Sequence, residues 1–480
     1  MKNLLYIISL CGLLTACDLQ EEPYGFYSDD NFYKSETDAE SGLLYAYNAL
    51  TFLEYSRGIF YIGDIPTETM SPKSDEAGDV YQLENWIANR ETEQLQYYFK
   101  YCYIAINRAN TVIDHIQNSS GLSETARRRI LGEAYFLRAW NYFNLVRTFG
   151  IVPVQTKMVA ELSQTTPPMA TGLDQLYDLI LGDLTRADNL LEVNKVFGRA
   201  DKVAAQSLMA KAYLTIASSK EHNVHRYTEM RREPRIMYDS AAYWAGKVVR
   251  DYKNVYDFDT NLRDIYDVDK PTGPEHIFIM PIDRSGTQEG NYSKLPLLFL
   301  PSNNSVPFYI RYGNGDLQRA NGNGWGVFLC NDEFVETQFS TTDKRRTELI
   351  HRDIYDASGN PIVPNQVKGY FSSKYVDPDF IGERTSARPY LIRFSDIALV
   401  YAEAAGPEAG LAYVNRIRER AGVTPLPSGM TTDKFREAVI KERALELAFE
   451  GNRLYDLRRT ASVTTTDIKA AGLSEAEAAY

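Results

Sequence analysis

The sequence predicts a mainly α-helical fold in which antiparallel helical hairpins of the tetratricopeptide kind support a second, irregular half. Apolar residues recur at helical spacing through most of residues 35–251. From about 252 to 390 the composition shifts to Gly, Asn, Pro and aromatic residues with few helical periods. Helical periodicity returns from 391 to the C-terminal region. The chain has 480 residues, of which 44% are hydrophobic, so it has enough apolar material for one to three domains.

The N-terminal segment MKNLLYIISLCGLLTAC predicts a signal peptide. Its apolar run from Leu4 to Leu14 is too short to span a bilayer as a helix. The following LTAC looks like a bacterial lipobox, in which Cys17 is acylated and becomes the mature N-terminus. An ordinary signal peptide with an incidental cysteine is the alternative. We therefore expect residues 1–16 to be removed, 17–34 to form a tether, and the acyl chains to hold the protein on a membrane.

Charge and aromatic content narrow the classes of partner. The net charge is −12, and −13 once Lys2 is lost with the signal peptide, which argues against nucleic acid. Tyrosine occurs 34 times and tryptophan 4 times. Tyrosine gives broad amphipathic surface that suits ligand platforms, although many of these rings must lie in the core.

Two cysteines remain after processing, Cys102 and Cys330. A disulfide between them is possible in an oxidising compartment, but two cysteines so far apart in sequence do not establish one. Cys102 lies in an apolar helical segment, so we expect it to be an inert buried thiol.

The first helix begins at Ser35, which can form a capping box with Asp38. Residues 60–90 interrupt the helical pattern with Pro66, Pro72, Gly78 and several acidic residues. We expect an irregular loop that ends around Trp86, and loops of this length in compact proteins are usually functional.

Five further helices complete the predicted helical portion of 35–251. They are expected at 91–117, 123–148, 173–191, 201–218 and 238–251. The stretch 134–146 is apolar nearly all round, which predicts a helix buried between neighbours. Successive helices of this length indicate stacked hairpins, although the sequence has no clean repeat.

The portion from 252 to 390 offers short strand candidates among loops, such as HIFIM at 276–280. The glycine-rich segment 313–326 could suggest a phosphate cradle, but nothing marks it as a strand-to-helix turn. It is better interpreted as a flexible loop that presents Trp325. Helices resume at Ile392, break at Gly406 and Pro407, and form a C-terminal portion, 391–480, that packs back on the helical half.

The segment 435–459 predicts one long amphipathic helix with an unusual polar face. Glu442, Glu446 and Glu450 recur every four residues, and like charges at that spacing destabilise an exposed helix by a few tenths of a kcal/mol per pair. Cations should therefore offset them. The candidates are Arg443, Arg453, Arg458, Arg459 and the three arginines of NRIRER at 415–420.

A pair of carboxylates is also what glycoside hydrolysis uses, so these glutamates could be catalytic. They lie along one side of one helix instead of facing each other across a cleft, which favours structural ion pairs. The same interpretation pairs Glu133 with Arg138, and Arg393 with Asp396.

Five segments in series resemble one known family. They are the lipobox, GEAYFLRAWNYFNLVRTFGIVPV at 132–154, PYLIRFSDIALVYAEAAG at 389–406, VNRIRERAG at 414–422 and KERALELAFEGNRLYDLRR at 441–459. Their order and spacing over nearly the whole chain resemble the SusD/RagB family of nutrient-binding lipoproteins. Members of that family have tetratricopeptide-like hairpins that support an irregular ligand-binding half.

The resemblance also implies a place and a role. Family members are lipid-anchored at the cell surface on the outer membrane, where they sit as a lid on a SusC-like TonB-dependent transporter. They bind glycans, or in some cases peptides, and do no chemistry. It therefore implies a protein that is not an enzyme and that captures oligosaccharides for uptake, with no cofactor and no metal.

Aromatic residues beside polar ones on loops are the candidate ligand-binding residues. A pyranose ring packs its C–H face on a flat aromatic ring, and its hydroxyl groups need polar side chains at the rim. One candidate group is Trp86 with Tyr81 and Asn85. The other consists of Trp325, Tyr312, Tyr309, Arg311 and Asn323. For each aromatic residue, packing in the core is the competing interpretation.

Three alternatives remain open. A member of the same family could bind peptide in place of glycan. A surface glycoside hydrolase would also be secreted, acidic and rich in aromatic residues, but the sequence lacks the HExxH, G-x-S-x-G and P-loop motifs of other enzyme classes. A helical-repeat scaffold without a small ligand is the third.

Overall fold

The computed structural model describes residues 32–73, 78–117, 119–288, 290–363 and 367–462. The predicted signal peptide, Cys17 and most of the predicted tether lie outside these residues. Within them the chain is mainly α-helical, and the strands form four two-stranded sheets. The predicted fold class is confirmed.

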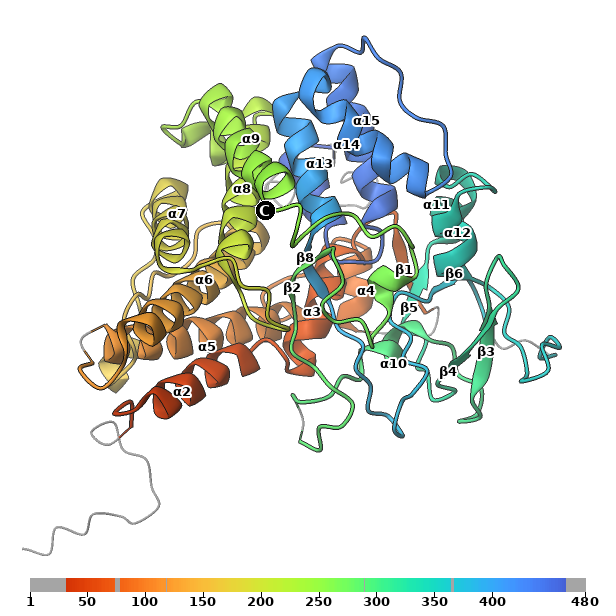
Figure 1. The fold of residues 1–480 in the computed structure, drawn as a ribbon, viewed down its shortest axis with the longest axis horizontal. Helices are drawn as coiled ribbons and strands as arrows, with labels where there is room; N and C mark the ends of the chain where they lie inside the picture. Colours follow the sequence, from red (N-terminus) through yellow and green to blue (C-terminus); the bar gives the residue numbers. More distant parts are fainter. Residues whose placement is uncertain (1–31, 74–77, 118, 289, 364–366, 463–480) are drawn as a thin grey trace, which may run out of the picture.

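The N-terminal half is built from helices packed in sequence order (Figure 1). Its elements are α2 (Glu36–Asn48), α3 (Leu53–Gly63), β1 (Met70–Pro72), α4 (Asp79–Glu84), α5 (Glu93–Ile116), α6 (Glu124–Phe149), α7 (Leu173–Leu190), α8 (Lys202–Glu221) and α9 (Pro234–Asp251). Helix α2 begins with the predicted capping box between Ser35 and Asp38. The predicted irregular segment 60–90 contains the end of α3, β1 and the short α4.

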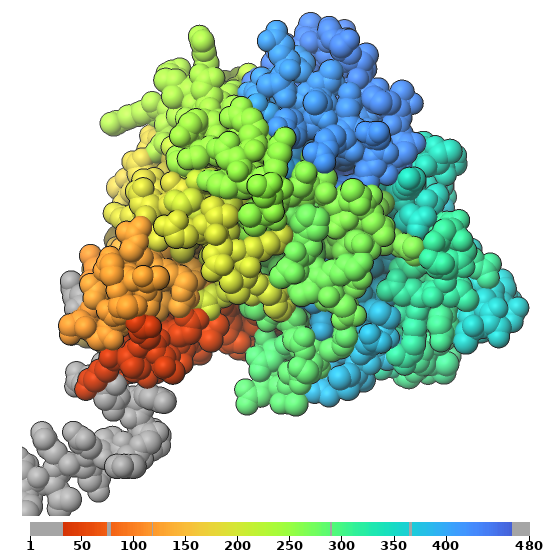
Figure 2. All heavy atoms as spheres, viewed as in Figure 1, coloured from red at the N-terminus to blue at the C-terminus, as the bar shows by residue number. Residues whose placement is uncertain are grey.

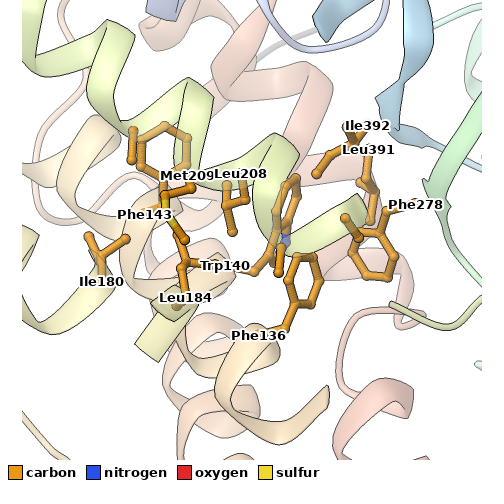
Figure 3. Packing of buried hydrophobic residues seen from close by; sticks show 14 of the residues in the cluster. Phe136, Trp140, Phe143, Ile180, Leu184, Leu208, Met209, Phe278, Leu391 and Ile392 are labelled. Atoms are coloured by element: carbon orange, nitrogen blue, oxygen red, sulfur yellow. The ribbon is translucent and has the colours of Figure 1, made fainter. Parts of the chain in front are cut away.

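Helix α6 is the centre of the largest core. As its sequence predicts, it is buried on nearly all sides from Ile130 to Val146. Figure 3 shows its rings between α7, α8 and the strands of the second half. Trp140 lies edge-on to Phe278 with ring centroids 5.6 Å apart, so the helical half and the irregular half share one apolar core.

The second half consists of short strands and helices joined by long connections. Its elements are β2 (His276–Ile279), α10 (Leu295–Phe299), β3 (Phe308–Arg311), β4 (Leu317–Ala320), β5 (Phe328–Cys330), α11 (Asp332–Gln338), α12 (Lys344–Leu349), β6 (Ile350–His351), β7 (Phe371–Ser372) and β8 (Tyr390–Arg393). The antiparallel pairs are β1 with β5, β2 with β8, β3 with β4, and β6 with β7. Because β1 belongs to the first half and β5 to the second, this sheet joins the two halves.

The C-terminal helices lie between the two halves in Figure 2, where their blue atoms border both the yellow-green and the cyan regions. They are α13 (Phe394–Ala405), α14 (Pro407–Arg420), α15 (Thr432–Glu446) and α16 (Arg453–Arg459). The prediction of one long helix over 435–459 is wrong, because the chain bends between α15 and α16. Phe449 and Gly451 have φ of 65° and 74° in the left-handed region, and a Cβ on Gly451 would overlap Ile59.

The bend changes what the apolar stripe of this segment does. Phe435 and Val439 pack in the core around α6, whereas Leu445 and Phe449 pack in a second cluster under β1 and β5. A straight helix would direct all four side chains to one face, but Leu445, in the last turn of α15, already packs in the second cluster, and the bend that follows brings Phe449 there as well. The bent segment instead contributes to both cores.

Cys102 and Cys330 are free, and each is buried in a different one of these clusters. The expectation of an inert buried thiol at Cys102 agrees with its environment, because burial raises its pKa beyond the usual range of a thiol. Among the described residues, every helix is too short or too polar to cross a lipid bilayer.

Candidate functional site

The glutamate row is buried and engaged in ion pairs at every position. Glu442 accepts hydrogen bonds from Arg345 at 2.6 Å and Arg418 at 2.5 Å. Glu446 accepts from Arg420 at 2.7 Å and from Arg393 at 2.9 Å. Structural pairing was the predicted role, and arginines of the NRIRER segment supply part of it.

The third glutamate, Glu450, accepts from Arg393 at 2.8 Å and from Lys374 at 2.7 Å. Neither cation was among the predicted partners, and Arg345 was not either. All three come from segments distant in sequence, on α12, after β7 and at the end of β8, and the spacing within a helix gives no sign of them.

The other predicted partners serve different acids. Arg443 binds Asp396 and Asp456, each at 2.8 Å. Arg459 binds Glu403 and Asp456. Arg453 binds Glu68 at 2.5 Å, and Arg458 donates to the carbonyl oxygens of residues 147 and 148 at the end of α6. Arg453 and Arg458 thus tie α16 to the helical half, while Arg443 and Arg459 join α13, α15 and α16 to one another.

Two predicted ion pairs are wrong. Glu133 is held by Arg129 and Arg199, while Arg138 forms a bidentate pair with Asp183 at 2.7 and 2.8 Å. The carboxylate of Asp396 binds Lys211 and Arg443, and Arg393 instead binds Glu275, Glu446 and Glu450. Both predictions relied on short sequence separation. Glu133 and Arg138 are five residues apart on α6 and point to different neighbours, and Arg393 ends β8 whereas Asp396 lies on α13.

The ion pairs also decide against catalysis by these carboxylates. Burial acts to raise the pKa of Glu446, but Arg420, Arg393 and Arg345 outweigh it and hold that pKa at about 2. A glycosidase acid needs a raised pKa so that it carries a proton near neutral pH. Glu446 is ionised there, and its arginine partners occupy its oxygens.

The first aromatic group lies on and after α4. Val80 and Leu83 anchor that helix in the second core cluster, and the Asp79 carboxylate accepts a hydrogen bond from the Gln94 backbone at 3.1 Å. Tyr81 points outward and is 53% exposed. The α4 scaffold therefore holds Tyr81 as a free ring on a fixed support.

Asn85 and Trp86 follow directly. Asn85 donates its side-chain N–H to the Tyr81 carbonyl at 2.9 Å, which closes the end of α4. Trp86 has a φ of 59° and is half-buried against the large core cluster. The chain changes direction at Trp86, whose backbone is strained. One part of its side chain packs on the core, and the other part is exposed to solvent.

Trp325 stands out from a tightly packed loop. Its backbone N–H donates to the Leu297 carbonyl at 2.6 Å, and its flanking residues Gly324 and Gly326 are buried. A Cβ on Gly324 would overlap the carbonyl oxygen of Leu300. Gly324 is thus needed for close backbone packing, and Gly326 has a φ of 59° in the left-handed region that favours glycine. The loop presents a Trp325 side chain that is 40% exposed.

The remaining candidates divide by strand alternation. On β3, Phe308 and Ile310 point into a small third cluster, and Tyr312 joins them in its interior. Tyr312 packs edge-on against His351 at 5.4 Å with the Arg263 guanidinium 4.5 Å from its ring centre. Tyr312 is buried in this cluster, which favours core packing over its predicted role in ligand binding.

Tyr309 and Arg311 lie on the outer side of β3, and the Arg311 side chain is already engaged by a neighbouring ring. The Tyr309 backbone pairs with Tyr355 at 2.8 and 2.9 Å, and the Arg311 guanidinium stacks 4.2 Å from the Tyr355 ring centre. Asn323 bridges to Ser302 at the base of the loop that presents Trp325.

The structure brings the two sequence-predicted regions to one sheet. Strand β1 leads toward α4 and pairs with β5, which follows Trp325, and the Lys73 N–H donates to the Val327 carbonyl at 3.1 Å. Helix α4, which carries Tyr81, contacts β1, and Trp325 lies just before β5, whereas Trp86 packs against the large core cluster. We call these three side chains the aromatic platform.

A shallow depression of about 290 Å³ adds residues that the sequence did not single out. It is lined by Thr51, Leu53, Ser56, Gly290, Tyr292, Ser293 and Lys294. Lys294 directly precedes α10, whose Leu297 carbonyl holds Trp325. A tyrosine between polar residues in GNYSK was the available signal. Across the described residues, no group of three or more His, Cys, Asp or Glu side chains is arranged to hold a metal ion.

Two family models match separate parts of the chain. Residues 353–477 match the model described as the SusD family, and residues 33–214 match one described as starch-binding and associating with the outer membrane. A SusD-like protein of Formosa agariphila is 24% identical over 95% of this chain and 89% of its own length.

Solved structures agree in fold. A laminarin-binding SusD-like protein superimposes with a TM-score of 0.72 at 21% identity, over 92% of this chain and 95% of its own. A second structure, described with a xylogluco-oligosaccharide, has a TM-score of 0.71 at 21% identity, over 90% of this chain and 85% of its own.

Proposed function

The chain is a member of the SusD/RagB family, and on that premise we propose that it is a cell-surface protein that captures oligosaccharides by means of the aromatic platform and does not cleave them. The observation that carries the proposal is Trp325, a half-exposed ring on a loop locked by buried glycines. A rigid, solvent-facing ring loses little conformational freedom when a sugar stacks on it.

The surroundings of the platform favour an extended glycan over a small molecule. Tyr81 is exposed on α4, which contacts β1, and Trp325 is exposed just before β5, so more than one sugar unit could contact protein. The neighbouring depression is shallow, and the half-buried Tyr292 contributes a phenol hydroxyl group to its lining. Structures of similar fold include one described as laminarin-binding and one with a xylogluco-oligosaccharide, which supports the choice of ligand class.

Binding without turnover follows from the state of the acids. All three glutamates are paired with cations, and the arginines around Glu446 hold its pKa at about 2, far below that of a proton donor. We also include in the proposal acylation at Cys17 and delivery of the glycan to a SusC-like TonB-dependent transporter. Isolation of the lipidated protein from outer membranes, with a TonB-dependent barrel co-purifying, would support both of these parts.

Calorimetry with laminarin- and xyloglucan-derived oligosaccharides tests the platform. Truncation of a central aromatic anchor costs about 2 kcal/mol, so Trp325→Ala should weaken Kd about 30-fold. Trp86→Ala should weaken it further in the double variant. Tyr243→Ala is the matched control, because Tyr243 is 56% exposed on α9, away from the β1–β5 sheet, and its loss should leave Kd unchanged.

Two results would contradict the proposal. Unchanged affinity in the double variant would remove the platform from the site. Release of new reducing ends by the purified protein would favour a glycoside hydrolase instead.

A further inference from the structure

Asp64 is a buried acid at the junction of the two halves. It ends α3, it is fully buried, and its Oδ2 accepts the Gly451 N–H at 2.7 Å, in the bend between α15 and α16. The backbone N–H of Arg453, the first residue of α16, also acts on this carboxylate. Asp64 therefore caps the bend from a distant part of the chain.

The contact between α3 and the bend is close. A Cβ on Gly63 would overlap the Gly451 carbonyl, and a Cβ on Gly451 would overlap Ile59. Neither segment can move toward the other, and the short Asp64 side chain fixes their spacing. The bend has no helical hydrogen-bonding partner of its own at Gly451, so the carboxylate supplies it.

The charges around Asp64 leave it without a cation of its own. Lys374 donates to Glu450 at 2.7 Å and to the Ala448 carbonyl at 2.9 Å, and the Arg453 guanidinium binds Glu68. The other titratable groups that act on Asp64 or are acted on by it are Glu450, Cys330 and Tyr375. Among the described residues the second oxygen, Oδ1, has no hydrogen-bond partner.

The base of the aromatic platform begins at this acid. The Asp64 carbonyl accepts from the Thr67 N–H at 3.0 Å and from its hydroxyl at 2.6 Å, and the Thr67 hydroxyl meets that of Thr69 at 2.8 Å. Thr69 in turn accepts the Asn331 N–H at 3.0 Å, next to β5. A continuous series of hydrogen bonds thus leads from Asp64 to the β1–β5 sheet.

We infer that Asp64 is a positioning residue that fastens the support of the aromatic platform to the bend between α15 and α16, and that the junction is destabilised when this buried carboxyl group, which has no cation of its own, ionises. The consequence for ligand binding rests on the function proposed above. The protonated group still accepts the Gly451 N–H through its carbonyl oxygen, while the uncompensated charge is removed.

The titration range fits such a role. Burial raises the pKa of Asp64 to about 7, although the N–H groups of Gly451 and Arg453 oppose the shift. The ordinary pKa is 3.8, so the folded protein holds a proton that the unfolded chain has lost throughout the interval from 3.8 to about 7. Stability contributed by this group therefore falls as pH rises through that interval and is constant above it.

Thermal unfolding of the wild type and Asp64→Asn at pH 5 and pH 8 tests the inference. Asn resembles the neutral acid and cannot ionise, so between these two values the wild type should lose about 3 °C of Tm more than the variant. Asp239→Asn, at an exposed position of α9, should follow the wild type. The buried His351, whose pKa falls to about 4 through burial, is common to both proteins and cancels in the difference.

Parallel Tm curves for the wild type and Asp64→Asn would overturn the inference. If the variant fails to fold, hydrogen exchange of the wild type decides: protection factors of residues 447–453, corrected for intrinsic rates, should be lower at pH 8 than at pH 5.5, and equal values would overturn it.

Oligosaccharide affinity at the same two pH values separates the two proposals. The wild type should bind more weakly at pH 8, and Asp64→Asn should bind equally at both. Complete absence of glycan binding with the expected Tm difference would sink the proposed function and leave the role of Asp64 supported.

Discussion

Replacement of Glu446 by glutamine removes one negative charge from the centre of the buried ion-pair network and leaves the surface charge unchanged. The side chain keeps its volume, so no cavity forms. It loses the full charge that faces Arg393 at 2.9 Å and Arg420 at 2.7 Å, and its new amide N–H groups point toward donors. Those arginines are themselves buried, so the variant leaves cationic charge partly uncompensated.

The expected magnitude follows in two ways. Breaking a buried pair by removing one partner costs about 3–5 kcal/mol. The pKa of Glu446 lies at about 2 against an ordinary 4.5, and at about 1.4 kcal/mol per pKa unit this gives roughly 3 kcal/mol. With an unfolding entropy of about 2.1 cal/mol/K per residue, a chain of this length should lose about 3–5 °C in Tm.

Differential scanning calorimetry at neutral pH measures this change. Glu437→Gln is the matched control, because Glu437 is an exposed residue of the same helix, and its Tm should stay within about 1 °C of the wild type. The pKa of Glu446 is depressed in the folded state, so its stabilising contribution is present above pH 4.5 and is lost as pH falls toward 2. The Tm gap between wild type and Glu446→Gln should therefore narrow over that range.

Oligosaccharide affinity should be nearly unchanged in Glu446→Gln at a temperature where both proteins are folded. A variant with normal Tm and selectively weakened affinity would refute this account, because it would move the ligand site to α15.

Two further predictions concern the loop and the thiols. Gly324→Ala should displace Trp325 by forcing a methyl group onto the Leu300 carbonyl, and so weaken oligosaccharide affinity, whereas Gly172→Ala, in open space, should not; equal affinities would show that the loop tolerates the methyl group. Cys102 and Cys330 are buried with raised pKa values, so neither should react with iodoacetamide until the protein unfolds, and modification of the native protein would contradict their placement.

Local patterns were sufficient for most of the helical scaffold. The capping box at Ser35 and the apolar perimeter of 134–146 depend on neighbours in sequence, and both appear in the structure as predicted. The bend after α15 was not predicted, because 435–459 keeps helical spacing throughout. The bend depends on Gly63 and Ile59, which are far away in sequence. They pack so closely against Gly451 that there is no room for a side chain at that position.

The site was predictable in part for the same reason. The exposure of Trp325 could be predicted from its glycine neighbours, which predict a flexible loop. In the structure, Gly324 instead allows the loop to pack closely on the backbone of Leu300 and Pro301. The burial of Tyr312 follows from its inward position beside Phe308 and Ile310 in a cluster that includes distant strands, and no local pattern contains that information. The pairing of Arg345 with Glu442 and of Lys374 with Glu450 could not be predicted for the same reason, because these residues are far apart in sequence.

The most direct test of the central claim is a binding panel of purified protein against glycan oligosaccharides and peptides, with thermal shift as the readout and mass spectrometry of the recovered ligand. A ligand that binds only the folded protein raises Tm by an amount that grows with its concentration. We predict a concentration-dependent rise with at least one oligosaccharide, recovered intact. A rise with peptides and none with any glycan, or recovery of cleaved sugar, would contradict the claim.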